Sequence, residues 1–345
     1  PFAYLPLNPD GKGGFSYTGG RSIPKEASRI CVKTIPEDFS QVKEAYWEIP
    51  ESHMTSSHHC NHTPEMRIGL MSDLHMTDKP GRIRTALNRM KDMDLVLMAG
   101  DLVNNCESLQ YDRLASVIEE TIPAKPIFAV AGNHDIPECQ KKDYRCFEQW
   151  LHGRIRERYA FMDSGSGAFA AMLGPGVDLI GLNPLYARKI FYFPEKGAQL
   201  QWLNQYLTDS PARQHIILCH APLLAHNPQR SPEGKSPYLA QDTALQEIVD
   251  QQRNIIFISG HTHLSPDIPS GCVEYDSMRE NLYINDGSIC PVDLKSTEAV
   301  LPSEWRDGCY TELRIYGDSV EIIMRYLHSG KRISRGYYNI PVMDP

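Results

Sequence analysis

The chain has 345 residues, of which 41% are hydrophobic and 23% are charged, so it can bury a large core without help from disulfides. Its formal net charge of -8 provides no broad basic field, which argues against long DNA or RNA as the main partner. No uninterrupted apolar run reaches the roughly eighteen residues of a membrane helix, so no membrane span is predicted.

Residues 1–64 are rich in Gly, Pro and Ser, which predicts an N-terminal extension of loops and short strands. From Met66 onward, apolar runs alternate with helical patterns. The expected elements are strands at 66–72, 95–99 and 126–131, with helical stretches at 82–91, 108–120 and 141–158.

The second half of the chain continues the same alternation. Strands are expected at 179–182, 215–219 and 255–259, with amphipathic helices at 199–207 and 243–250, and further strands at 282–285, 310–316 and 320–327. This order predicts an α/β fold with buried strands. We assign residues 65–330 to one catalytic domain and residues 331–345 to a C-terminal tail.

The nine cysteines are an odd number scattered along the chain, unlike the dense pattern of a small secreted scaffold. Cys139 and Cys146 are close enough in sequence to pair, but two reduced thiols beside a helix are the preferred interpretation. A cytoplasmic location is therefore favoured. Because the chain starts at Pro1, we expect that an upstream segment, which could have carried an export signal, has been removed.

Metal-capable side chains follow almost every predicted strand. Open α/β sheets place their sites beyond the carboxyl ends of the strands, so these side chains are expected to converge. The clusters are Asp73-Leu74-His75, Gly100-Asp101, Gly132-Asn133-His134-Asp135, His220 and Gly260-His261-Thr262-His263. Each alone is weak, since a lone His is usually structural and Asn-His-Asp could simply cap a helix. Five clusters in order, each after an apolar run, predict a common metal site.

The residue types indicate which ions would bind. Carboxylate and amide oxygens mixed with imidazole nitrogens suit Mn, Fe or Zn better than a metal that prefers thiolates. A glycine precedes Asp101, Asn133 and His261, which fits tight turns where the backbone passes close to an ion.

This order of motifs resembles the signature of the calcineurin-like metallophosphoesterases: Asp-X-His, Gly-Asp, Gly-Asn-His-Asp/Glu, His and Gly-His-X-His. The resemblance covers roughly Met66 to Leu327, and every block is present. The spacing and the helix around Trp202 are most similar to the bacterial branch that includes cyclic-nucleotide phosphodiesterases. The resemblance implies a four-layer α/β/β/α sandwich, in which two sheets are flanked by helices.

The resemblance also implies a binuclear centre of two divalent or trivalent ions, Mn or Fe first and Zn as the alternative. One ion would be held by Asp73, His75 and His263, the other by Asn133, His220 and His261, and Asp101 would bridge both. A hydroxide bridging the ions would attack phosphorus in line while the ions neutralise the phosphate oxygens.

His134 matches a family histidine that is not a ligand and is expected to give a proton to the leaving oxygen or to stabilise its charge. In the phosphoprotein phosphatases of the family, an Asp three residues after the bridging Asp supports this histidine; here that position is Asn104. An amide can orient an imidazole but cannot stabilise its cation by charge. We therefore predict a weaker acid function for His134, or a substrate with a good leaving group.

Two loops are candidates for choosing the substrate, with a solvated connection as the equal alternative for each. In the loop at 226–238, Arg230 or Lys235 could meet a phosphate; the other loop contains Arg188, Lys189 and Tyr192. The histidines between residues 53 and 62 are interpreted as adventitious, because no second ligand pair follows at zinc-finger spacing.

The leading hypothesis is a phosphodiesterase acting on a small diester, a cyclic nucleotide or a related molecule. A phosphomonoesterase with the same metals is the alternative. The metal ligands are the same for both activities, and the residues that line the pocket determine which ester is hydrolysed. A nuclease is disfavoured by the acidic charge, and a scaffold without catalysis by the filled ligand positions. A homo-oligomer and the role of residues 1–64 stay open.

Overall fold

In the computed structural model, the described part of the chain comprises residues 63–136, 146–187, 190–193, 195–223, 242–263, 272–276, 278–291 and 307–341. Short N-terminal strands are also described: β1 (Asn8–Pro9) pairs with β2 (Phe15–Ser16), and β3 (Arg29–Thr34) pairs with β4 (Lys43–Glu48). Short strands were expected in this region. The division of the chain at residue 64 stays a prediction.

One central sheet has six strands in the order β19-β18-β17-β5-β6-β7. They are β5 (Met66–Met71), β6 (Leu95–Ala99), β7 (Ile127–Val130), β17 (Cys309–Ile315), β18 (Ser319–Tyr326) and β19 (Arg332–Pro341). Strands β5, β6 and β7 run parallel, so their carboxyl ends lie at one edge of the sheet. Strand β19 pairs with β18, so the sheet continues into residues 331–345, which the sequence alone suggests as a tail.

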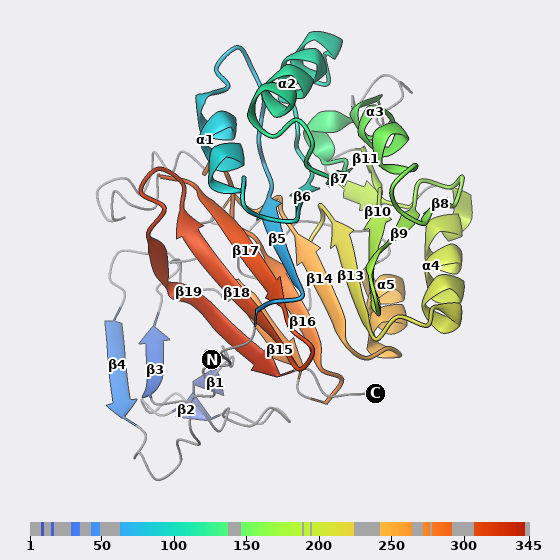
Figure 1. The fold of residues 1–345 in the computed structure, drawn as a ribbon. Helices are drawn as coiled ribbons and strands as arrows, with labels where there is room; N and C mark the ends of the chain where they lie inside the picture. Colours follow the sequence, from blue (N-terminus) through green and yellow to red (C-terminus); the bar gives the residue numbers. More distant parts are fainter. Residues whose placement is uncertain are drawn as a thin grey trace.

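The other central sheet has seven strands in the order β15-β16-β14-β13-β10-β9-β8. They are β8 (Phe161–Asp163), β9 (Phe169–Gly174), β10 (Val177–Leu182), β13 (Gln214–Cys219), β14 (Ile255–Ser259), β15 (Val273–Asp276) and β16 (Asn281–Asn285). Strands β10, β13, β14 and β16 are parallel, and they too share a carboxyl edge (Figure 1).

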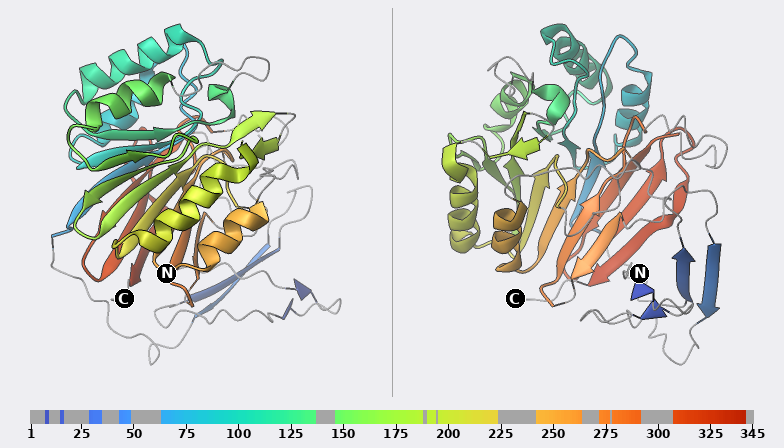
Figure 2. Two further views of the ribbon diagram at one scale, coloured as in Figure 1. Left: turned by 90° about the vertical axis from the view of Figure 1, so that its right-hand side faces the viewer. Right: turned by 180° about the vertical axis from the view of Figure 1, so that it is seen from behind.

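Helices cover part of the outer face of each sheet (Figure 2). On the side of β5–β7 lie α1 (Gly81–Arg89), α2 (Ser108–Thr121) and α3 (Cys146–Ile155); on the side of β13 lie α4 (Ala198–Asp209) and α5 (Asp242–Asp250). One apolar cluster joins residues of the two sheets, and two others join each sheet to its helices. The expected four-layer sandwich is therefore confirmed.

Strand β6 shows why these segments become central strands. Leu95, Leu97 and Ala99 belong to the apolar cluster between the sheets, whereas Val96 and Met98 belong to the cluster under the helices. Successive side chains of a strand point to opposite faces, so a continuous apolar run is needed wherever both faces are covered.

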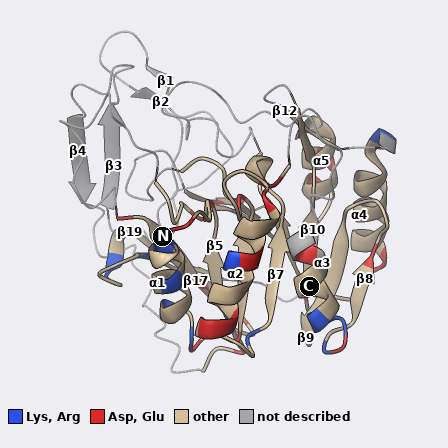
Figure 3. Cartoon of the chain, turned by 90° about the horizontal axis from the view of Figure 1, so that it is seen from above, with Lys and Arg blue, Asp and Glu red and all other residues tan. Residues whose placement is uncertain are grey.

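The outer helices carry charges of both signs, as Figure 3 shows for α2. Arg84 on α1 pairs with Glu120 on α2, and Arg154 on α3 pairs with Glu119 on α2. None of the described helices combines the length and the apolar character that crossing a bilayer requires.

Candidate metal centre

The predicted ligands lie in the loops that follow β5, β6, β7, β13 and β14, where the carboxyl edges of the two sheets meet. Hydrogen bonds hold the two edges together. The Nδ1 of His220, after β13, lies 2.6 Å from the carbonyl oxygen of Ala99 at the end of β6. The backbone nitrogen of Ala131, after β7, donates to Asn183 Oδ1, after β10, at 2.7 Å.

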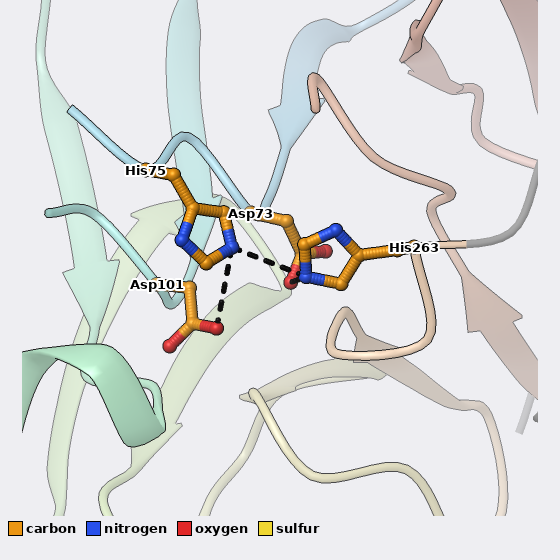
Figure 4. A group of neighbouring side chains, drawn as sticks. All are labelled: Asp73, His75, Asp101 and His263. Carbon is orange, nitrogen blue, oxygen red and sulfur yellow. Dashed lines mark hydrogen bonds and ion pairs between the residues drawn. The ribbon is translucent and has the colours of Figure 1, made fainter. Parts of the chain in front are cut away.

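One set of side chains that could hold an ion, called group A, consists of Asp73, His75, Asp101 and His263, whose ligand atoms lie within 4.8 Å of one another (Figure 4). The Nε2 atoms of His75 and His263 face each other at 3.1 Å. His75 Nε2 also lies 3.6 Å from Asp101 Oδ2, and His263 Nε2 lies 3.2 Å from Asp73 Oδ1.

A second set, called group B, consists of Asp101, His220 and His261 and meets the same distance limit. His220 Nε2 lies 3.4 Å from Asp101 Oδ2. Both His220 Nε2 and Asn133 Oδ1 are buried and have no hydrogen-bond partner among the described residues. Buried polar atoms normally have a partner, so the unpartnered His220 Nε2 fits a cation at group B. Asp101 is the member that both groups share.

Two of the histidines have a ring orientation that leaves Nε2 available for ligation. His220 Nδ1 donates to the Ala99 carbonyl, and His263 Nδ1 donates to the Cys290 carbonyl, each at 2.6 Å. A neutral imidazole with its proton on Nδ1 presents a lone pair on Nε2. Backbone carbonyls that fix the ring in this way are typical of metal-binding histidines.

The electrostatics of the site favour neutral imidazoles at His75 and His261. Burial lowers the pKa of His75, although Asp101 and Asp73 oppose this shift. Burial, followed by the neighbouring His220, lowers the pKa of His261 to about 3. Because only the neutral ring binds a metal, these shifts prepare both side chains for ligation.

The pair formed by His220 and Asp101 titrates differently. Burial lowers the pKa of His220, but the contact with Asp101 outweighs it and raises the pKa to about 9. Conversely, burial raises the pKa of Asp101, while His220 lowers it below its ordinary value. A cation bound between the two side chains would take the place of the His220 proton, so ion binding at group B is expected to release a proton.

The backbone is strained at five of the predicted ligands. Non-glycine residues rarely adopt a positive φ, and each such residue costs about 1–3 kcal/mol. The five residues are Asp73 (φ 51), His75 (φ 44), Asp101 (φ 51), His261 (φ 72) and His263 (φ 54). Such strain collects at functional sites, where the surrounding fold holds it in place.

The three predicted glycines stand where the loops pass closest. A Cβ at Gly132 would lie 2.2 Å from Asp101 Oδ1, and a Cβ at Gly260 would lie 2.6 Å from Ser72 Cβ. At Gly100, which also has φ +87, a Cβ would lie 2.5 Å from His220 Nδ1. Only glycine leaves these ligands in their positions.

His134 lies beside group A, with its ring centroid 4.5 Å from that of His75. Its backbone nitrogen donates to Asp101 Oδ1 at 2.7 Å. Its Nδ1 lies 2.7 Å from the backbone carbonyl of Asn104, whereas the side-chain amide of Asn104 donates to Asn105 at 3.0 Å. The residue at this position therefore orients His134 through its main chain, and the amide expected to do so points elsewhere.

Asp135 is a functional residue whose role the sequence did not reveal. Its buried carboxylate accepts hydrogen bonds from the backbone nitrogens of Leu102 and Val103 at 3.1 Å and of Gly132 at 2.8 Å, and from Tyr111 Oη at 3.1 Å. It thereby ties the loop after β6 to the loop after β7. The sequence signal for this role is the Asp that ends the motif Gly-Asn-His-Asp, for which the sequence indicated only metal binding or the capping of a helix.

Phe191 is a second residue of the site that no sequence motif indicated. It belongs to the hairpin of β11 (Leu185–Ala187) and β12 (Ile190–Tyr192), and it is fully buried. Its ring meets those of His261 and His220 edge-on, at centroid distances of 5.1 and 5.9 Å. Of the proposed substrate loops, Tyr192 lies in β12, while Arg188, Lys189 and residues 226–238 lie outside the described residues.

Comparison with known proteins agrees with this geometry. The family model for the calcineurin-like phosphoesterases matches residues 66–265, more than half of the chain. The chain belongs to the calcineurin-like phosphoesterase family. Members of this family generally bind two divalent metals, and groups A and B are the candidate ligand clusters.

Curated relatives place the chain near one branch of this family. A probable cyclic nucleotide phosphodiesterase of Fibrobacter succinogenes is 28% identical over 181 residues, which are 48% of this chain and 60% of the relative. A protein of the same description from Synechococcus is 28% identical over 211 residues, 57% of this chain and 73% of the relative. The first alignment thus spans less than two thirds of the relative's length. The expected resemblance to the bacterial cyclic-nucleotide-phosphodiesterase branch is confirmed.

Solved structures support the fold. A dimetal phosphatase from Danio rerio superposes with a TM-score of 0.57 at 14% identity, covering 81% of this chain and all of the other. GAP50 of Plasmodium superposes with a TM-score of 0.51 at 14% identity, covering 82% of this chain and 90% of the other.

The structure describes five of the nine cysteines with their side chains. In the described part of the chain, Cys106, Cys219, Cys272, Cys290 and Cys309 form no disulfide. Cys139 lies outside the described residues, as does the side chain of Cys146, so their reduced state stays a prediction.

Proposed function

We propose that this protein is a metal-dependent phosphoester hydrolase, and that it is a phosphodiesterase acting on a small diester, a cyclic nucleotide or a related molecule, with two ions of the Mn or Fe type. The observation that carries the proposal is that Asp101 belongs to two ligand groups at once, each with ligand atoms within 4.8 Å. In the proposed assignment, group A holds one ion, and His220, His261 and Asn133 hold the other with Asp101 as the bridge.

When bound, the two ions would supply an activated water and neutralise charge on the phosphate. The side chains of the protein would position the reacting groups and transfer a proton to the leaving oxygen. Asp101 Oδ1 accepts a hydrogen bond from the backbone nitrogen of His134 at 2.7 Å. This bond holds the proposed bridging carboxylate at a constant distance from the proposed proton donor. With Nδ1 directed at the Asn104 carbonyl, His134 would use Nε2 to protonate the leaving oxygen of an in-line displacement.

The charges around the site support a diester over a monoester. A diester carries one negative charge, whereas a monoester carries up to two near neutral pH. The strongest charge interactions of Asp101 and His261 are with His and Asp side chains, and no Lys or Arg is among them in the described part of the chain. The bound ions would then be the main positive charge that meets the substrate.

The proposal is tested by comparing kcat/KM for an aryl phosphate diester, the corresponding monoester and a cyclic nucleotide on metal-loaded protein. We expect the two diesters to be preferred; preference for the monoester would replace the proposal with a phosphomonoesterase. Elemental analysis of the purified protein identifies the ions. An Asp101→Asn variant that keeps both ions and full activity would show that the bridge is wrongly assigned.

The role of His134 has its own test. His134→Asn should lower kcat and remove one limb of the pH–rate profile, with a smaller loss on diesters whose leaving group needs no proton. An unchanged profile would contradict the proton-donor role.

A further inference from the structure

A buried carboxyl group lies behind the candidate metal centre. Asp286, in the loop after β16, is 1% exposed. Its Oδ1 lies 2.6 Å from Ser72 Oγ, and Ser72 Oγ lies 2.6 Å from Asp73 Oδ2. A longer contact of 3.3 Å joins Ser72 Oγ to the Gly287 carbonyl. Ser72 therefore connects a carboxyl group outside both ligand groups with a member of group A.

The number of available hydrogen atoms limits which of these contacts can be hydrogen bonds. A serine hydroxyl carries one hydrogen and donates it to one acceptor at a time. If both carboxyl groups were ionised, one of them would face an oxygen lone pair at 2.6 Å. Distances of about 2.5–2.7 Å are those of strong hydrogen bonds between a hydroxyl and a carboxylate. Both contacts can be hydrogen bonds only if one of the two carboxyl groups is protonated. That proton then supplies the second hydrogen bond, in addition to the one donated by Ser72.

The surroundings identify the protonated group. Both oxygens of Asp73 accept from the backbone nitrogen of His261 at 3.2 Å, so each of them already has a hydrogen-bond donor. Asp286 Oδ2, in contrast, is buried without a hydrogen-bond partner among the described residues. Burial raises the pKa of Asp286 well above its ordinary value. A buried, unpartnered carboxylate oxygen is costly, whereas a neutral carbonyl oxygen in that place costs much less.

We propose that Asp286 is a neutral carboxylic acid that donates to Ser72, which in turn donates to Asp73, and that this relay positions Asp73 for the ion of group A. The inference rests on the proposed binuclear site. The relay adds a second donor at Oδ2 of Asp73, while Oδ1 lies 3.2 Å from His263 Nε2, inside the group. It also keeps a second negative charge away from the centre. Asp286 and Ser72 are positioning residues, since neither belongs to a ligand group.

The relay is tested with Asp286→Asn, Asp286→Ala and Ser72→Ala. An amide is neutral and can donate to Ser72, so Asp286→Asn should bind both ions with nearly wild-type affinity. Asp286→Ala and Ser72→Ala should each weaken the binding of one ion by about 10- to 100-fold, the usual effect of removing a partner of a metal ligand. The double variant should be no weaker than Ser72→Ala alone, because Asp286 acts through Ser72.

The measurement is titration of metal-free protein with Mn²⁺, followed by elemental analysis of the ions retained, with thermal unfolding of each metal-free variant recorded in parallel. Asp178→Asn is the matched control: Asp178 is also fully buried, but it lies at the amino end of β10, where it accepts from Tyr206 and Ser210 at 2.9 and 2.8 Å. It should alter thermal stability and leave ion binding unchanged.

Two outcomes would overturn the relay while the proposed function stands. Wild-type protein that binds two ions, with Asp286→Ala and Ser72→Ala binding them equally well, would mean that Asp73 needs no positioning. Asp286→Asn as weak as Asp286→Ala would mean that Asp286 works as an anion. Wild-type protein that holds fewer than two ions would instead remove the proposed function and the relay together.

Discussion

Alanine at position 132 would disturb the packing that holds Asp101 in both ligand groups. Gly132 has φ -103 and ψ -174, an extended conformation open to any residue, so a methyl group adds no backbone strain. The Cβ would, however, lie 2.2 Å from Asp101 Oδ1 and 2.3 Å from the Asp101 backbone nitrogen. Since ordinary contact begins at 3.4 Å, the loop or the carboxylate has to move by roughly 1 Å.

A displacement of this size in a positioned group lowers the rate by about 100-fold, and overpacking of this kind costs about 1–3 kcal/mol of stability. The assay is hydrolysis of an aryl phosphate diester by Gly132→Ala, with the metal content measured on the same sample. The matched control is Gly153→Ala in α3, where a Cβ meets nothing within 4 Å and the helix should gain up to about 1 kcal/mol. A Gly132→Ala variant that keeps both ions and wild-type turnover would show that the position of Asp101 does not depend on this glycine.

Three further outcomes are expected. Tyr111→Phe removes the 3.1 Å hydrogen bond to Asp135 and should lower the free energy of unfolding by about 1 kcal/mol in urea, with both ions retained; loss of an ion would contradict this. Burial opposes ionisation of Glu312, but Arg314 and Arg67 lower its pKa below 4.5, so its stabilisation is present at neutral pH and is lost as the pH falls through the lowered pKa. Glu312→Gln should therefore be less stable by about 1–2 kcal/mol at pH 7, and the difference should shrink as the pH falls through the lowered pKa of Glu312. A difference that does not change with pH would contradict this assignment. Chelation should stop hydrolysis and lower the unfolding temperature, because a site filled at about 100 times its Kd adds about 2.7 kcal/mol; an unchanged melting curve would argue against bound ions in the native protein.

The sequence predicted the central strands well because the relevant signal is local. Strand β6 and strand β14 have the predicted bounds, since a run of five apolar residues in β6 and of four in β14 leaves little choice of ends. Strand β19 was not predicted: its sequence RISRGYYNIP alternates imperfectly and contains Gly336, so pairing with β18 decides its structure. Such long-range pairing cannot be read from a window of neighbouring residues.

In the candidate site, too, some residues could be predicted from local sequence and others could not. Asp73, Asp101 and His261 could be selected because each carries a metal-binding group directly after an apolar run. Asp286 and Phe191 could not, since a buried Asp and a buried Phe give no signal of their own, and their importance comes from contacts across the fold. The support of His134 by the Asn104 carbonyl was missed because a backbone contact does not depend on which residue occupies the position.

The left-handed backbone at His75 and His263 has a thermodynamic consequence for anyone who modifies this protein. Glycine or asparagine would adopt these conformations more readily than histidine, so replacing either ligand should make the ion-free polypeptide harder to unfold while it abolishes turnover. Screens that select for heat resistance alone would then enrich inactive molecules, because substitutions at the proposed ligands His75 and His263 also relieve backbone strain.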